Sequence, residues 1–504
     1  MSQKKVIELS KLLCSSDKKK VKKGLKQLST FKTEELASLF EGSGLLSQYF
    51  VIDASGKLYR GTGAYAERYE IKLNERFSKT AHGQAVTMHW LALNGQLKAI
   101  KHLKLQVKDA SLLPWIELSK LEGLEGLSFE GELPSYSYLQ PIKPLKHLSL
   151  VNAYCESSLT DLPQQLESLI LADLELEDLT DLSHLSELKS LKLWGMGLDS
   201  LNGLAQLQNL VELELDAEDL SDISELAQAK SLKSLQLSVG CMEDPENISP
   251  VLEVLSKLTQ LEQLILEDLS GDLTCTSQIL LCLSQHTQLH HLSIPLDRTP
   301  DNLSGLSALP QLTHLALHYE LCQQVDIRFD SSALTSLVNL ESLSLGSNLA
   351  DEDLQNLNQL PALKSLTLKQ TSGVTQLGTL NLEKLETLSL TWWPETYQIS
   401  EQEWSRLVDL KNFKLEGYLP DPIVFKQLKG LEKLDLIDVE LTSLNSLLEL
   451  QSLKHLKLVS CPVLSDISAL NDFPLEQLVI LNCPKLKGLK AKDISTSSTI
   501  QYLH

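Results

Sequence analysis

A six-residue leucine pattern, Leu-x-x-Leu-x-Leu with Ile or Phe allowed at the leucine positions, recurs along most of this 504-residue chain. It begins seventeen times, at a mean spacing of about 23 residues, and a fixed period of this size indicates a solenoid. The hexads start at Ile100, Leu124, Leu145, Leu166, Leu188, Leu210, Leu232, Leu261, Leu289, Leu312, Leu340, Leu363, Leu385, Leu410, Leu431, Leu453 and Leu475. The chain therefore folds into stacked coils, one supersecondary unit to each repeat.

The alternation inside a hexad predicts a strand in every coil. In the hexad LKSLKL and the residue after it, Leu191 and Leu193 should point into the coil, whereas Ser190, Lys192 and Trp194 point outward. One coil cannot bury its own leucines, so neighbouring coils must stack and share a continuous aliphatic core. Their strands then form a parallel sheet on the concave side.

The positions after the hexad suggest a family. The ninth repeat position is Asn348 in one repeat and Cys461 and Cys483 in the last two full repeats. The returning segments 198–204 and 464–470 are apolar at every third residue, a period that suits a 3₁₀ turn. Residues 97–490 thus resemble the leucine-rich-repeat family, and the 22-residue repeats are similar to those of internalins and phosphatase regulators. The resemblance implies an α/β solenoid, a leucine-rich-repeat horseshoe with a concave parallel sheet and a mostly 3₁₀ or irregular convex side.

Three longer repeats depart from this pattern, and the third, which begins at Leu312, contains a polar segment, residues 323–332, that we expect to be a surface loop. Those that begin at Leu232 and Leu261 are 29 and 28 residues long, and residues 248–258 and 277–284 have the spacing of amphipathic helices. These repeats resemble the ribonuclease-inhibitor type, so we expect true α-helices there on the convex side.

The flanking segments differ from the repeats. Residues 1–45 predict a small helical N-terminal region, because apolar residues recur at helical spacing. Residues 46–96 predict a small α+β segment, with two strands around a turn near Gly56, that caps the open end of the coil stack. Residues 491–504 are expected to form a C-terminal tail.

Charge excludes some functions. Lys and Arg number 45 and Asp and Glu 66, for a formal net charge of −21, although nine lysines lie within residues 1–30. Nucleic acids and anionic membranes repel so acidic a chain, so we expect neither as a partner. Without a Sec-type signal or a long apolar run, the expectation is a soluble cytoplasmic protein, and eight scattered cysteines do not indicate a disulfide framework.

No catalytic signature is present in the sequence. It contains no Gly-x-Ser-x-Gly, no phosphate loop and no His-Glu-x-x-His, so we predict neither an enzyme nor a cofactor.

Histidines on the concave side raise the question of a metal. His291 and His314 occupy the third hexad position of adjacent coils, and His318 points outward from the strand of His314. Three imidazoles could bind zinc, but no carboxylate or thiol stands beside them in the same columns. We predict that these histidines are polar contact residues or solvent-facing side chains and that they bind no metal.

Large or charged outward residues are the best contact candidates. Trp194 should stand beside Asp216 of the next coil, where Glu212, Glu214 and Asp216 share one strand. Trp and Tyr are enriched in binding hot spots, which adds Tyr319 and Trp392. The three carboxylates favour a ligand with a basic surface.

Two functions fit these observations. The first is a non-enzymatic scaffold that binds a protein partner on the concave sheet. The second is a regulatory or targeting subunit of an enzyme, or an exported bacterial effector, that acts through residues 1–96.

Overall fold

The computed structural model divides the chain into two compact units, one of Met1–Leu232 with Ser238–Met242 and one of Lys233–Leu237 with Glu243–His504. The structure describes residues 8–28, 49–52, 58–60, 69–71, 101–107, 121–216, 220–238, 248–267, 276–296, 303–318, 331–346, 351–369, 380–393, 401–419, 422–486 and 499–503, without positions 10, 14, 16, 154, 156, 196, 221 and 381.

In the first unit, every strand of the repeat begins two residues after the start of its hexad. These strands are β4 (His102–Val107), β5 (Gly126–Gly131), β6 (His147–Val151), β7 (Ser168–Ala172), β8 (Ser190–Trp194) and β9 (Glu212–Asp216). Consecutive strands pair in parallel with equivalent residues opposite each other, as Leu169 is opposite Leu191. Both leucines are fully buried. The predicted inward positions are therefore confirmed.

The second unit repeats this arrangement. Its strands are β11 (Gln263–Glu267), β12 (His291–Pro295), β13 (His314–His318), β14 (Ser342–Leu345), β15 (Ser365–Lys369), β16 (Thr387–Trp393), β17 (Asn412–Gly417), β18 (Lys433–Ile437), β19 (His455–Val459) and β20 (Gln477–Leu481), each paired in parallel with the next. Strand β10 (Ser234–Ser238) has residues in both units. Within the segment expected as a tail, β21 (Thr499–Leu503) adds a further strand in parallel to β20.

The returning limbs are mostly 3₁₀ turns, as the period of three predicts. Those of the first unit are η5 (Tyr136–Leu139), η6 (Leu159–Asp161), η7 (Thr180–Leu182), η8 (Leu204–Gln206) and η9 (Ser224–Gln228). Those of the second are η10 (Leu283–Gln285), η11 (Ser304–Ala308), η12 (Ser331–Ser336), η13 (Leu382–Lys384), η14 (Pro422–Gln427), η15 (Asn445–Leu447), η16 (Ser468–Asp472) and η17 (Pro484–Leu486).

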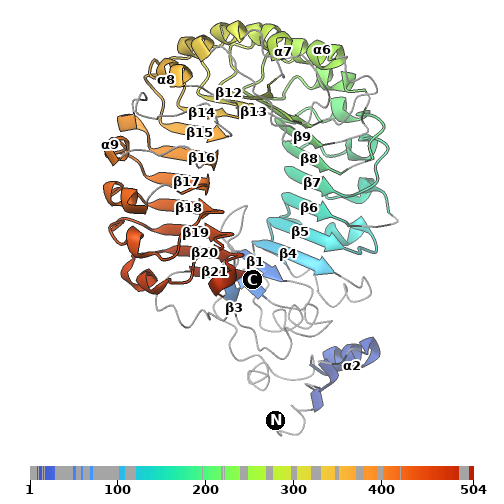
Figure 1. The fold of residues 1–504 in the computed structure, drawn as a ribbon. Helices are drawn as coiled ribbons and strands as arrows, with labels where there is room; N and C mark the ends of the chain where they lie inside the picture. Colours follow the sequence, from blue (N-terminus) through green and yellow to red (C-terminus); the bar gives the residue numbers. More distant parts are fainter. Residues whose placement is uncertain are drawn as a thin grey trace. The chain divides into compact units, whose positions relative to one another are not determined.

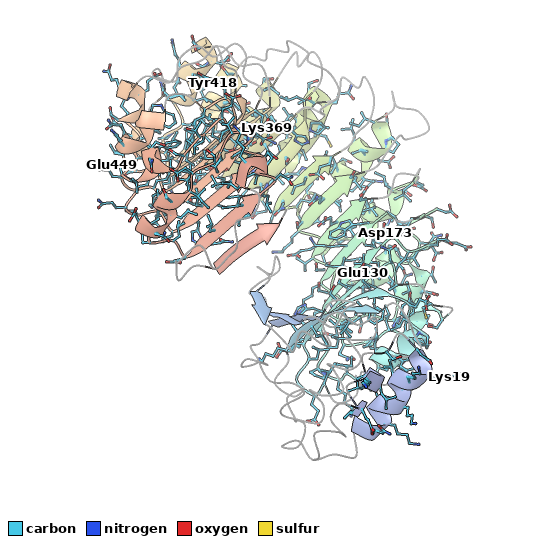
Figure 2. The ribbon with its side chains drawn as sticks, turned by 60° about the horizontal axis from the view of Figure 1, so that its bottom comes forward. Lys19, Glu130, Asp173, Lys369, Tyr418 and Glu449 are labelled. Atoms are coloured by element: carbon cyan, nitrogen blue, oxygen red, sulfur yellow. The ribbon has the colours of Figure 1, made fainter. Side chains whose placement is uncertain are left out.

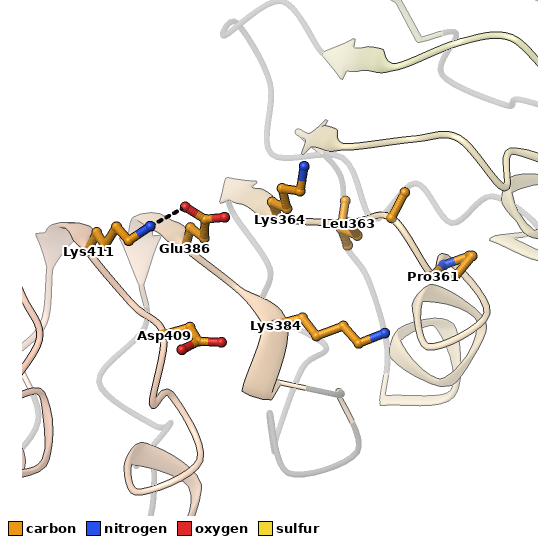
Figure 3. A pocket seen from close by; sticks show the side chains of 8 residues that line it. Pro361, Leu363, Lys364, Lys384, Glu386, Asp409 and Lys411 are labelled. Carbon is orange, nitrogen blue, oxygen red and sulfur yellow. Dashed lines mark hydrogen bonds and ion pairs between the residues drawn. The ribbon is translucent and has the colours of Figure 1, made fainter.

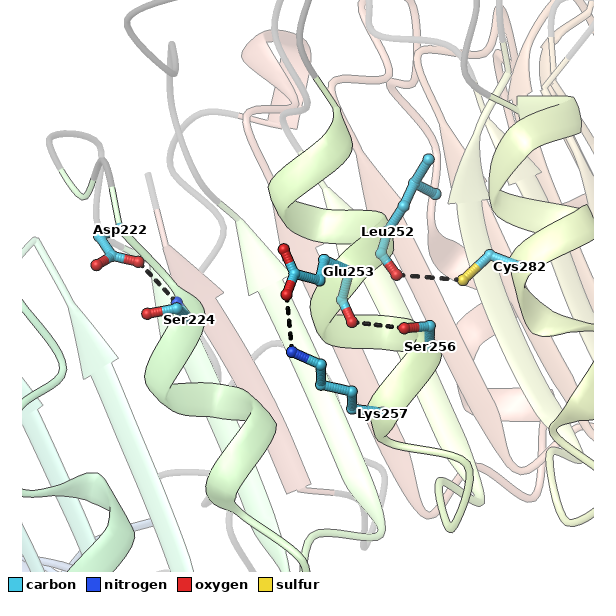
Figure 4. A network of polar contacts seen from close by, with 7 residues as sticks. All are labelled: Asp222, Ser224, Leu252, Glu253, Ser256, Lys257 and Cys282. Atoms are coloured by element: carbon cyan, nitrogen blue, oxygen red, sulfur yellow. Dashed lines mark hydrogen bonds and ion pairs between the residues drawn. The ribbon is translucent and has the colours of Figure 1, made fainter.

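The repeats that begin at Leu232 and Leu261 carry the predicted α-helices, α6 (Ser249–Lys257) and α7 (Thr276–Cys282), on the side of the coils opposite the strands (Figure 1). The Cys282 thiol donates to the Leu252 carbonyl at 3.3 Å and joins α7 to α6 (Figure 4). Two further helices, α8 (Asp351–Leu357) and α9 (Glu401–Trp404), were not expected from the sequence.

The N-terminal segment contains α2 (Lys18–Leu28) and the strands β1 (Tyr49–Ile52), β2 (Leu58–Arg60) and β3 (Tyr69–Ile71). Strand β1 pairs antiparallel with β2, which confirms the two predicted strands, whereas the predicted turn near Gly56 lies outside the described residues. Strand β1 also pairs parallel with β4, so it extends the repeat sheet at its first strand. The limits of the four segments remain predictions. Among the described residues, no helix has the length and apolar character needed to span a bilayer.

Candidate functional site

Strands β8 and β9 bring three of the predicted contact residues together with a lysine. Because the two strands are in register, Lys192 lies opposite Glu214 and Ser190 opposite Glu212. The Trp194 indole N–H donates to Glu214 Oε1 at 2.8 Å, and Lys192 Nζ donates to Glu214 Oε2 at 2.5 Å. Lys192 Nζ also lies 5.8 Å from the centre of the Trp194 ring, within cation–π range.

This Trp194–Lys192–Glu214 cluster refines the predicted arrangement. The indole hydrogen bond goes to Glu214, two residues before the Asp216 that the repeat alignment placed beside Trp194. The lysine already neutralises Glu214, whose side chain is four-fifths buried. The exposed Glu212 stands at the edge of the cluster and leaves negative charge there for a ligand.

The neighbouring strands continue the cluster with an apolar patch that sequence reasoning missed. Ala172 lies opposite Trp194, and Val151 opposite Ala172, while Ile170 occupies the central outward position of β7. Ala172 is buried, and Val151 and Ile170 are half-buried. Apolar residues at outward positions of consecutive hexads were the available signal for this patch.

The histidine pair takes the predicted positions. His291 lies opposite His314, and the two rings stack with centroids 5.3 Å apart and planes at 17°. Burial and the neighbouring His314 hold the pKa of His291 below its ordinary value, which favours the neutral form of the His291 ring. His318 lies opposite Pro295. Among the described residues, no three His, Cys, Asp or Glu side chains are placed to hold a metal.

The remaining candidates are less defined. Trp392 lies in strand β16, but its side chain is outside the described part of the structure, as is the whole of Tyr319. Neither can be assigned to the cluster.

A regular feature that sequence reasoning missed runs along the second hexad position, where lysine and glutamate alternate from coil to coil. We call this column the charge ladder, with Lys101, Glu125, Lys146, Glu167 and Lys189 in the first unit and Glu341, Lys364, Glu386, Lys411, Glu432, Lys454 and Glu476 in the second. Glu167 accepts from both neighbours, at 2.7 Å from Lys146 Nζ and 2.8 Å from Lys189 Nζ. These two hydrogen bonds lower the pKa of Glu167 to about 2.

Backbone hydrogen bonds hold the charge ladder in place. The Lys146 carbonyl accepts the N–H groups of both Glu167 and Ser168, at 2.8 and 3.0 Å, and equivalent pairs of bonds join the other coils of each unit. A cavity of about 390 Å³ adjoins the charge ladder in the second unit (Figure 3). Two of the charged residues that line it, Glu386 and Lys411, neutralise each other at 2.7 Å.

No protein-family model matches the chain, and no curated protein matches it. Among solved structures, an internalin (InlF) from Listeria monocytogenes is 21% identical, with 76% of this chain and 96% of that chain covered and a TM-score of 0.43. A leucine-rich-repeat protein from Leptospira interrogans is 21% identical, with 81% and 92% covered and a TM-score of 0.35.

A third similar structure is that of TLR13 in complex with ssRNA13, which is 18% identical. The match covers 77% of this chain and 58% of the TLR13 chain, with a TM-score of 0.40. The identification itself rests on the repeat and on the strand register. Seventeen hexads give seventeen strands, each two residues after its hexad start, so the chain has the leucine-rich-repeat fold.

Proposed function

We propose that this chain is a non-enzymatic scaffold that binds a protein partner on the concave face of its repeat sheet, with a basic segment of the partner against strands β8 and β9. The observation that carries this proposal is the Trp194 indole, held on the sheet by Glu214 and Lys192. A large ring that is already fixed loses little entropy on binding, which is the property of a hot-spot residue.

Charge favours a basic segment over an acidic one. The outward positions of β8 and β9 carry three carboxylates, Glu212, Glu214 and Asp216, against one ammonium group, Lys192. A Lys or Arg of the partner could approach Glu212 at the exposed edge, while its aliphatic carbons cover the ring and the neighbouring Ala172. The proposed contact set keeps His291, His314, His318, Tyr319 and Trp392 as further candidates.

Under this proposal the protein has no catalytic role and binds no cofactor, nucleic acid or membrane. It functions in the cytoplasm. The described cysteines Cys155, Cys282, Cys461 and Cys483 are free thiols, which suits a reducing compartment.

Affinity enrichment with the full chain tests the concave site. Trp194→Ala should weaken the free energy of partner binding by about 2 kcal/mol or more, mainly through faster dissociation. The matched control is Leu281→Ala, which removes an apolar side chain that is 73% exposed on α7, on the opposite side of its coil. A partner that both variants retain equally, at unchanged melting temperature, would contradict the proposal.

The second candidate is a regulatory or targeting subunit that acts through residues 1–96. The basic helix α2 favours it, because it concentrates positive charge in an otherwise acidic chain. Deletion of residues 1–96 should then abolish recruitment, while Trp194→Ala leaves it intact.

A further inference from the structure

The helix α2 concentrates lysines over a short stretch of the chain. Its sequence, KKKVKKGLKQL, contains Lys18, Lys19, Lys20, Lys22, Lys23 and Lys26 and no acidic residue. Lys19 and Lys23 are four residues apart and stand next to each other on the helix surface. Like charges at this spacing repel, so the isolated helix is strained by its own side chains.

The lysines lie on the outside because the other face of α2 is packed. Val21 and Leu25 are fully buried, together with Leu9 and Leu13 of the preceding helical residues. The approach is close, since a Cβ added at Gly24 would lie 2.9 Å from Leu13 Cδ2. Lys19, Lys20, Lys23 and Lys26 are exposed, and Lys19 is labelled on this helix in Figure 2.

The lysines of the charge ladder differ from those of α2, because they form ion pairs with glutamates. Along the charge ladder, lysines such as Lys146, Lys189, Lys411 and Lys454 each lie 2.7–2.8 Å from a glutamate. Among the described residues, no carboxylate forms an ion pair with Lys19, Lys20 or Lys23. The nearby Asp17 caps the helix instead, because its Oδ1 accepts the backbone N–H of Lys19 at 2.9 Å.

We propose that the exposed lysine face of α2 is a docking surface for an acidic segment of a protein partner, separate from the concave site. Carboxylates spaced along such a segment would relieve the repulsion among the lysines. The packed apolar face leaves α2 nothing to insert into a bilayer, and the helix has no aromatic residue on which a base could stack. The chemistry of the helix therefore favours an acidic protein segment over a lipid surface or a single-stranded nucleic acid.

Fluorescence anisotropy with a labelled poly-L-glutamate peptide tests this surface in the full chain. The triple variant Lys19→Gln, Lys20→Gln, Lys23→Gln should bind the peptide about tenfold more weakly, and added salt should weaken wild-type binding in the same direction. The triple variant with Arg at these positions should keep wild-type affinity, because it keeps the charge.

A matched control separates the helix from net charge. Lys143, Lys369 and Lys429 are exposed lysines on the coils, and their triple change to Gln alters the charge of the chain by the same amount. This control and Trp194→Ala should both bind the peptide like the wild type. Equal loss in the coil control would overturn the proposal, as would tighter binding of poly(U) RNA or of phosphatidylserine vesicles through the same three lysines.

Discussion

Gly203 occupies a position where the backbone leaves no room for a side chain. Its φ is +101°, a conformation that residues with a Cβ rarely adopt, and an added Cβ would lie 2.4 Å from the Leu179 carbonyl carbon of the preceding coil. Next to Gly203, the Asn202 carbonyl accepts a hydrogen bond from the Leu179 N–H at 2.8 Å. We expect Gly203→Ala to lower the free energy of unfolding by about 2 kcal/mol or more, measured by urea denaturation.

Gly197 in the same coil is the matched control. Nothing lies within 4 Å of the position of its missing Cβ, and its φ is not positive. Gly197→Ala should change the free energy of unfolding by less than about 1 kcal/mol. Equal destabilisation by the two substitutions would show that close approach at Gly203 is not the cause.

The eighth repeat position shows why some residue-scale features escape sequence reasoning. The chain leaves its strands with positive φ at this position, through Gly131, Gly195 and Gly417 and also through Asn152, Asp173, Asp438, Ser460 and Asn482. Asn and Asp tolerate this conformation better than most residues with a Cβ. A position shared by Gly, Asn, Asp and Ser gives no single letter to recognise, whereas the leucine positions do.

At the scale of the strand and its coil, the leucine pattern predicts the elements and their register, whereas the polar residues do not reveal which side chains contact each other between coils. Alternation fixes which leucines are buried, so the strands and their register follow from the sequence, as do α6 and α7. The Trp194–Glu214 bond and the charge ladder depend on which coil lies beside which. Aligning the second hexad positions of successive repeats would have revealed the ladder. Strand β21 was missed because residues 491–504 contain no hexad.

Glu167 provides an element-scale prediction, because it joins three coils through Lys146 and Lys189. Its pKa is lowered from 4.5 to about 2, so the carboxylate stabilises the folded state above pH 4.5 and this stabilisation is lost as the pH falls towards about 2. Melting temperatures of wild type and Glu167→Gln should therefore differ at pH 6 and converge near pH 2.

The control for this prediction is Glu187→Gln. Glu187 is exposed and forms no ion pair among the described residues. Its substitution should leave the melting temperature near the wild-type value at every pH, and high salt should reduce the effect of Glu167→Gln alone. A constant difference between wild type and Glu167→Gln across the pH range would contradict the assigned ion pairs.

Over the whole molecule, the chain is a series of coils in which each contacts chiefly its neighbours. The stability of such proteins is close to the sum of the stabilities of the single coils and of the contacts between neighbouring coils. A destabilising substitution should therefore affect the adjacent coils of its unit most and distant coils least. The fully buried Leu191 of β8 lies in the first unit and Leu456 of β19, 1% exposed, lies in the second. These two leucines occupy the same hexad position and form a matched pair.

Native-state hydrogen exchange can follow this spread. Leu191→Ala should cost about 2–5 kcal/mol through lost burial and the cavity left behind, whereas Ser190→Ala, at an outward position, should cost little. In Leu191→Ala, amide protection should fall most in β7, β8 and β9 and remain unchanged in β18, β19 and β20. Leu456→Ala should show the reverse. Uniform loss of protection across both units in either variant would mean that the chain unfolds as one cooperative block, and the nearest-neighbour description would then be wrong for this protein.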